Sequence, residues 1–228
     1  MTFEELRQKN IALFAELKTN SNVLVIESNE TFEDLSEDDK EWEISGIKEA
    51  YNLVLPEKMR ELLYLDSVHI CWHYVIDGRK ETGGEFRLKR TQTIFVNIPK
   101  TAFADDLTPW GKSLYKEGYR FFDAHPNAGD GIFMAIKIEN GTVADPVWYV
   151  DVIHEDMWPL ELDYPQYIEH SLYLKGLYKW QYLFAKMNFR GLDFDISSLR
   201  RKLEDYPRLF PGYDVSEYLK RYKERGGE

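Results

Sequence analysis

The sequence predicts an α+β fold, in which a central, mainly antiparallel sheet is flanked by helices. Three observations support this prediction. Segments with helical periodicity lie towards both ends of the chain, segments rich in β-branched and aromatic residues cluster between residues 68 and 150, and the two kinds do not alternate regularly. A doubly wound parallel sheet, and with it a nucleotide-binding fold of that type, is therefore disfavoured.

The composition narrows the class of protein. The chain has 228 residues, of which 43% are hydrophobic and 15% aromatic, and this is enough apolar volume for a core. Its 40 acidic and 29 basic residues give a net charge of −11, which disfavours binding to nucleic acids and to anionic lipid. One cysteine cannot form an internal disulfide, and we find neither a membrane-spanning run nor a signal peptide. We expect a soluble, cytoplasmic protein.

Residues 1–43 predict a helix, a short strand and an acidic connector. Thr2 and Glu5 have the spacing of a capping box, and Asn20 begins the polar stretch that ends the helix. Residues 23–26 are typical of a strand. Residues 27–43 hold nine acidic residues and one basic residue, which we interpret as a solvated connector or, alternatively, as an acidic arm for a basic partner. The apolar stripe of the helix consists of Phe3, Leu6, Leu13, Phe14 and Leu17.

The next segments predict two helices and then strands. One helix carries Ile44, Ile47 and Tyr51 and ends at Asn52, and a second begins at Pro56. Strands are expected at 68–76, 85–88 and 93–98, with a turn at 77–78.

The rest of the chain predicts a loop, three strands and four helices. Asn140-Gly141 favours a hairpin, Asp163 an N-cap and Gly176 a helix end, and Pro207 and Pro211-Gly212 predict a break between the last two helices. The expected segments are a long surface loop with about one helical turn at 100–118, strands at 119–122, 132–138 and 146–150, and helices at 163–176, 180–184, 197–206 and 215–225.

His69, Cys71 and His73 raise the possibility of a metal site. In a strand their spacing places all three on one face, and imidazole and thiolate are good zinc ligands. However, alternate side chains of a strand are parallel and do not converge, and the paired spacings of zinc sites are absent. We therefore expect a packed, partly polar sheet face, and a metal-dependent hydrolase that uses His69, His73 and a carboxylate is the less favoured alternative.

Two further groups combine carboxylates with histidine. In residues 125–131, Asp130 lies between Gly129 and Gly131, where an aspartate commonly stabilises a turn by accepting backbone amides. Asp151, with residues 154–156, forms an acidic patch after a strand, which could serve acid–base chemistry but is more typical of a solvated loop. Motifs of phosphate-binding loops, metalloproteases and serine hydrolases are absent from the sequence.

Several segments, in this order, resemble the SUKH superfamily of Smi/Knr-type proteins. The resemblance extends from about residue 44 to 184, and the terminal helices and the acidic connector lie outside it. The segments are 44–56 (ISGIKEAYNLVLP), 83–88 (GGEFRL), 119–123 (YRFFD), 129–131 (GDG), 146–149 (PVWY), 158–163 (WPLELD), 167–168 (YI) and 176–184 (GLYKWQYLF).

The resemblance implies a SUKH-like domain at 44–190. Residues 1–43 precede it with a helix, a short strand and an acidic connector, and we expect a C-terminal helical extension at 191–228 to pack on the domain. It implies no shared catalytic residues, and we expect no cofactor and no metal. Many bacterial members are immunity proteins, so we expect a non-enzymatic protein that binds and neutralises a toxin, for example a basic nuclease. A Smi/Knr-type regulator or scaffold without a toxin is the alternative. The expected partner contacts are Asp123, Asp130, Asp151, Glu155 and Asp156.

Overall fold

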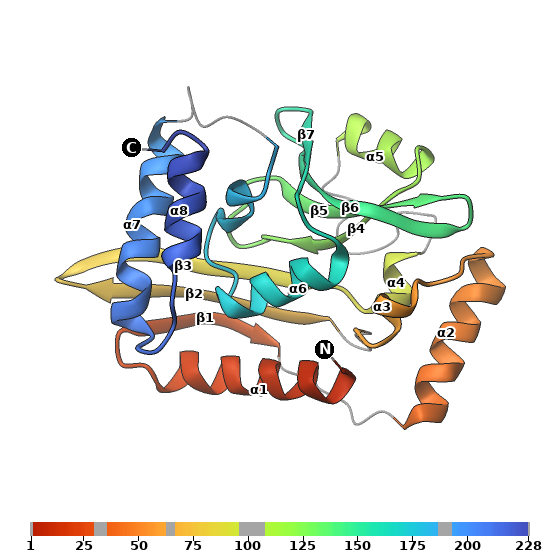
Figure 1. The fold of residues 1–228 in the computed structure, drawn as a ribbon, viewed down its shortest axis with the longest axis horizontal. Helices are drawn as coiled ribbons and strands as arrows, with labels where there is room; N and C mark the ends of the chain where they lie inside the picture. The colour runs from red at the N-terminus through yellow and green to blue at the C-terminus, as the bar shows by residue number, and fades with distance from the viewer. Residues whose placement is uncertain (1, 30–35, 63–66, 96–107, 187–192, 228) are drawn as a thin grey trace.

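The computed structural model describes residues 2–29, 36–62, 67–95, 108–186 and 193–227, which form an α+β fold, as predicted (Figure 1). The helices in these ranges are α1 (Phe3–Thr19), α2 (Glu37–Tyr51), α3 (Glu57–Arg60), α4 (Thr91–Ile94), α5 (Pro109–Lys116), α6 (Tyr164–Tyr173), α7 (Asp193–Leu209) and α8 (Ser216–Glu224), with a 3-10 helix, η1 (Trp180–Leu183). The strands are β1 (Val23–Asn29), β2 (Val68–Ile76), β3 (Arg79–Leu88), β4 (Tyr119–Ala124), β5 (Ile132–Glu139), β6 (Thr142–Asp151) and β7 (Asp156–Pro159).

The described strands form two antiparallel sheets. The first has the order β1-β2-β3 and the second the order β4-β5-β6-β7. The antiparallel pairing is confirmed, but the expectation of one central sheet is wrong. Between the end of β3 and β4, one backbone hydrogen bond joins the Lys89 amide to the Phe122 carbonyl at 2.9 Å, and no strand ladder continues it in the described residues.

A buried carboxylate replaces that ladder at the junction of the two sheets. Asp123 lies at a bulge in β4 and is fully buried. One carboxylate oxygen accepts the amides of Arg87 (2.7 Å) and Ala124 (2.8 Å), and the other accepts the Tyr167 hydroxyl from α6. The Asp123 side chain thus accepts the Arg87 amide, which a neighbouring strand would otherwise accept. The two sheets therefore meet here without forming one continuous sheet.

The N-terminal helix forms as its sequence predicts. Thr2 and Glu5 make the reciprocal bonds of a capping box, and the chain leaves the helix at Asn20. The apolar stripe faces the core, with Leu6, Leu13, Phe14 and Leu17 buried. The turns at Asp77-Gly78 and Asn140-Gly141 have positive φ throughout, as hairpin turns of this type require.

Two apolar clusters sandwich the four-stranded sheet. The larger one joins α1, α6, α7 and α8 to both sheets and includes fully buried Trp72 and Trp180. A smaller one lies between α5 and the other face of the sheet and includes Leu114, Phe121 and Phe133. Since apolar groups cover both faces, every residue of β4 is buried.

A buried lysine ties the two ends of the chain together. The Lys175 ammonium lies 3.0 Å from the Glu16 carboxylate of α1, and 3.7 Å and 4.6 Å from the ring centroids of Tyr213 and Phe210. The Tyr213 hydroxyl donates to the same Glu16 carboxylate at 2.9 Å. The charge is therefore surrounded by one carboxylate and aromatic faces, the partners that a desolvated ammonium needs.

Three of the predicted connections differ in the structure. Residues 91–94 form α4 where a strand at 93–98 was expected, and residues 96–98 lie outside the described ranges. Residues 109–116 form α5, capped by the Thr108 hydroxyl with Pro109 in the first turn, which is longer than the single helical turn expected within the loop at 100–118, and residues 100–107 lie outside the described ranges. The short strand β7 was not predicted, because its four residues carry little pattern.

Two other predictions fail at helix boundaries. The acidic stretch is not all connector: residues 27–29 extend β1, and Ser36 caps α2, which contains the acidic residues from Glu37 to Glu43. Of the residues expected to separate the last two helices, Pro207 lies inside α7 near its end, whereas Pro211-Gly212 does lie between α7 and α8. The helical bond from Phe210 to the Tyr206 carbonyl (2.8 Å) still forms, so the missing amide of one proline does not end the helix.

None of the helices in the described ranges has the length and the apolar composition that crossing a bilayer requires.

We expect Asp123→Asn to lower the free energy of unfolding by about 1–3 kcal/mol, because Oδ1 can still accept the two backbone amides but the new amide nitrogen would face the Tyr167 hydroxyl, which donates to the carboxylate. Urea denaturation measures this change. Asp156→Asn, at an exposed position, is the control and should cost less than about 0.5 kcal/mol. Equal losses for both variants would contradict the junction role.

Candidate functional site

Four of the five carboxylates predicted as partner contacts lie at one end of the four-stranded sheet. Asp130 is in residues 125–131, between β4 and β5, which we call the Gly–Asp loop. Asp151 is the last residue of β6, and Asp156 is the first residue of β7. Glu155 lies between the two strands in residues 152–155, which we call the β6–β7 turn. A hydrogen bond from the Val152 amide to the Gly131 carbonyl (3.0 Å) joins loop and turn. Asp123 is instead buried at the sheet junction, where it cannot touch a partner.

Asp130 stabilises the turn, as its glycine neighbours predict. Its carboxylate accepts the Ile132 amide at 3.0 Å, and its other oxygen lies 3.6 Å from Nδ1 of buried His125. Burial alone would lower the pKa of His125, but the carboxylates of Asp130, Asp123 and Glu85 hold it above its usual value. For Asp130 the signs are reversed: burial alone would raise the pKa of its carboxyl group, but His125 holds that pKa below its usual value. Each group therefore favours the charged form of the other.

Asp151 also holds backbone amides in place, and the exposed carboxylates at this end of the four-stranded sheet follow it in the chain. Its carboxylate accepts the amides of Ile153 (3.1 Å) and His154 (3.0 Å) and contacts the His154 ring at 2.8 Å, and the residue is buried. Glu155 has a positive φ of 56°, and both Glu155 and Asp156 are exposed. Of the expected contacts, only these two carboxylates are fully available to a partner.

Glu85 is the residue that sequence reasoning missed. It is buried on β3, and its carboxylate accepts the amides of Asn127 (2.8 Å) and Ala128 (2.9 Å) and contacts His69 Nε2 at 3.0 Å. It thereby holds the Gly–Asp loop against the three-stranded sheet. The glycine before it, Gly84, was a signal in the sequence that the backbone is closely approached here. In the structure a Cβ at Gly84 would lie 2.4 Å from the Gly176 carbonyl oxygen.

A cavity of about 370 Å³ opens beside the Gly–Asp loop, and we call it the Gly–Asp pocket. Its walls are mostly apolar, and Ile153 at its edge is 58% exposed. Ile153 therefore extends the apolar surface of the pocket to the outside of the protein, although it is not the most exposed apolar residue described, since Trp42 is 69% exposed. The lining residues are Thr108, Ala124, His125, Pro126, Gly129, Gly131, Ile132, Phe133, Val152 and Ile153.

The His69, Cys71 and His73 side chains do share a face of β2, but they do not assemble a metal site. His69 is committed to Glu85, and a bulge in the pairing falls between Trp72 and His73. Burial, followed by the nearby Glu85 charge, raises the pKa of Cys71 to about 11, so the thiol stays protonated at neutral pH. Within the described ranges, no three His, Cys, Asp or Glu residues are grouped so that they could hold a metal ion.

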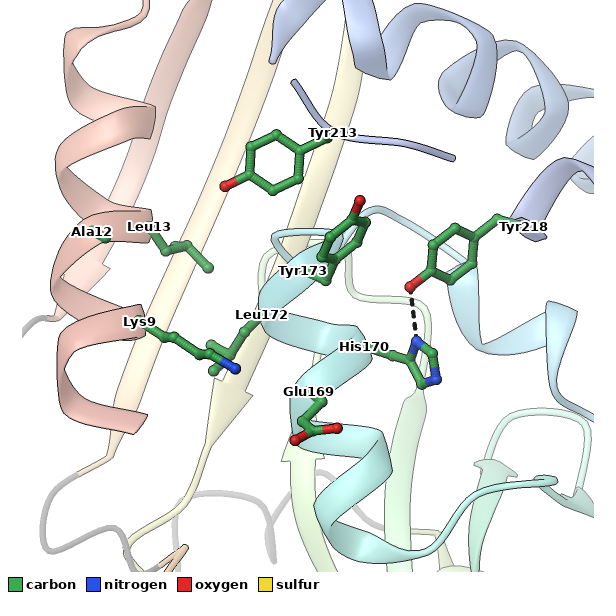
Figure 2. Close-up of a pocket in the computed structure, with 9 residues that line it drawn as sticks. All are labelled: Lys9, Ala12, Leu13, Glu169, His170, Leu172, Tyr173, Tyr213 and Tyr218. Carbon is green, nitrogen blue, oxygen red and sulfur yellow. Dashed lines mark hydrogen bonds between the residues drawn. The ribbon is translucent and has the colours of Figure 1, made fainter. Parts of the chain in front are cut away.

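A second cavity, of about 450 Å³, lies between α1 and α6 and is closed by residues of the C-terminal region (Figure 2). We call it the tyrosine pocket. It was not predicted, because its walls come from separate parts of the chain. The lining residues are Lys9, Ala12, Leu13, Glu169, His170, Leu172, Tyr173, Tyr213 and Tyr218.

The hydroxyls of the three tyrosines are all bonded within the protein. Tyr213 donates to Glu16, Tyr173 donates to the Asp214 carbonyl (3.0 Å), and Tyr218 bonds His170 Nδ1 (2.8 Å). The rings are therefore held in place, and what they offer to the cavity is carbon surface. Burial, followed by the charge of Arg221, lowers the pKa of His170 to about 4, so this wall is uncharged at neutral pH.

A scan against models of protein families, a search of curated proteins and a search of solved structures each find no match. The resemblance to the SUKH superfamily therefore stays a prediction that rests on the segments quoted above.

We expect Gly131→Ala to destabilise the protein by about 2 kcal/mol, because φ is 70° and the new Cβ would lie 2.5 Å from Ile153 Cγ1. Gly129→Ala is the matched control, since φ is 61° but nothing lies within 4 Å of its Cβ, and it should cost about 1 kcal/mol. Thermal unfolding compares the two. A Gly129→Ala effect as large as that of Gly131→Ala would argue against the contact between loop and turn.

We expect acid to destabilise the protein partly through His170. The unfolded chain binds a proton there below its usual pKa of 6.5, but the folded protein binds it only below about 4. The free energy of unfolding should therefore fall by about 2–3 kcal/mol more between pH 6.5 and 4 in the native protein than in His170→Gln. Urea titrations at several pH values measure the difference, and identical pH slopes would refute the assignment.

Proposed function

We propose that this chain is a non-enzymatic protein-binding module whose partner docks at the end of the four-stranded sheet formed by the Gly–Asp loop and the β6–β7 turn. The observation that carries the proposal is the exposed Ile153 side chain beside the apolar Gly–Asp pocket, with the carboxylates of Glu155 and Asp156 next to it. Apolar anchors surrounded by polar groups are the usual centres of protein interfaces.

The chemistry of this surface defines the partner. A pocket of about 370 Å³ has room for one large apolar side chain, and the neighbouring carboxylates favour basic residues around it. The net charge of −11 would also speed the approach of a basic partner through long-range attraction. The docking surface is preformed, because Asp130, Asp151 and Glu85 already hold its backbone amides.

The resemblance to the SUKH superfamily supplies the particular form of the proposal. We propose that the partner is a bacterial toxin and that the protein neutralises it by covering its active surface, as an immunity protein does. A basic nuclease toxin fits the acidic composition best. The mechanism is occlusion, so no residue of this chain takes part in bond making or breaking.

Co-expression with the products of the genes beside this one tests whether the chain neutralises a toxin. We expect the native chain to protect cells and to bind the toxin directly in calorimetry. Ile153→Asp should weaken binding by about a hundredfold, because it places a charge at the apolar anchor.

Val54→Asp is the matched control. Val54 is 49% exposed, and its amide bonds the Gly141 carbonyl at the opposite end of the sheet. This variant should bind and protect like the native chain. Failure of the native chain to protect would reject the toxin as partner, and equal loss in both variants would reject the docking surface.

A further inference from the structure

The tyrosine pocket is built by elements that do not contribute to the Gly–Asp pocket. Its walls are α1, α6, α8 and the turn that carries Tyr213, whereas the Gly–Asp pocket belongs to the four-stranded sheet and its loops. A ligand of the tyrosine pocket therefore need not be the protein partner proposed above.

The two ends of the tyrosine pocket differ in chemistry. Figure 2 shows the side chains of Lys9, from α1, and Glu169, from α6, at one end, and Tyr173 and Tyr213 towards the other. Leu13 and Leu172 lie between the ends. One end thus presents both a positive and a negative group, on different helices, and the rest is apolar or aromatic.

The side chains that line the aromatic end are held in place and are themselves uncharged, although the Lys175–Glu16 ion pair contacts Tyr213. Each tyrosine hydroxyl is held by a partner in the protein, and the rings of Tyr173 and Tyr213 pack at a centroid distance of 5.2 Å. His170 is neutral above about pH 4. A ligand group bound here meets ring surface and aliphatic carbon and loses little entropy by ordering the site.

We propose that the tyrosine pocket binds a free α-amino acid with a large apolar or aromatic side chain. The carboxylate of the ligand pairs with Lys9, its ammonium pairs with Glu169, and its side chain packs against Leu13, Leu172 and the tyrosine rings. The volume of about 450 Å³ is within the range of small-molecule sites. With exposed charges at one end and one ring buried, the dissociation constant should be about 1 mM.

L-Phenylalanine is the probe, added to the full chain and followed by NMR shifts of the Ala12, Leu13 and Leu172 methyl groups. Three analogues dissect the recognition: 3-phenylpropionate lacks the ammonium, phenethylamine lacks the carboxylate, and N-acetyl-L-phenylalaninamide lacks both charges. We expect L-phenylalanine to bind most tightly and the uncharged analogue least.

Three variants locate the site. Ala12→Phe, at an exposed helical position that lines the pocket, should fill it and abolish the shifts without unfolding the protein. Lys9→Gln and Glu169→Gln should each weaken binding by about twofold to fivefold, the range for exposed ion pairs. Lys48→Gln and Glu49→Gln on α2 are matched controls and should leave the affinity unchanged.

Absence of methyl shifts at about ten times the expected dissociation constant would overturn the proposal. So would binding that survives Ala12→Phe, or tighter binding of N-acetyl-L-phenylalaninamide, which would indicate a site for an apolar side chain of a protein. None of these results bears on toxin binding, because Ile153 and the Gly–Asp pocket are unchanged in every variant. Failure here and failure of the proposed function are thus distinguishable.

Discussion

The structure depends on one buried carboxylate. Asp123 accepts two backbone amides at the meeting point of the sheets and the hydroxyl of Tyr167, which brings α6 against both. Gln181 Nε2 lies 3.3 Å from the Tyr167 hydroxyl and 3.4 Å from His125 Nε2. These two long hydrogen bonds connect Tyr167 to the Gly–Asp loop. The geometry of the proposed docking surface therefore rests on a carboxyl group that is itself fully hidden from solvent and whose pKa is raised by burial.

Helix α6 links the two candidate sites. Tyr167 on one side of the helix joins the junction that supports the Gly–Asp loop, while His170 and Tyr173 form a wall of the tyrosine pocket. The capping box of Asp163 and Gln166 sets the start of this helix. A short, well-capped helix thus positions groups for two surfaces that share no lining residue.

Local signals in the sequence predicted much of the fold. The capping box at Thr2, the N-cap at Asp163 and the glycine turns at 77–78 and 140–141 depend on neighbouring residues and were predicted at their positions. The division into two sheets and the continuation of α7 through Pro207 were not, because both depend on partners distant in the chain.

The site shows the same limit. Sequence spacing predicted that Asp130 stabilises a turn, but it could not distinguish buried Asp123 and Asp151 from exposed Glu155 and Asp156. All four are carboxylates, and only the packing around each decides its exposure. Glu85 and the tyrosine pocket were missed for the same reason, since each draws its contacts from several segments.

The surroundings of Lys175 show that residues near both termini belong to one folding unit. Its ammonium is enclosed by Glu16 near the N-terminus and by Phe210 and Tyr213 near the C-terminus. A fragment that lacks the N-terminal helix would leave the buried ammonium without its carboxylate, at a cost of several kcal/mol, and one that lacks the C-terminal region would remove the rings that shield the ion pair from water. The terminal segments therefore belong to the folding unit, because the surroundings of the buried ammonium are complete only when both segments are present.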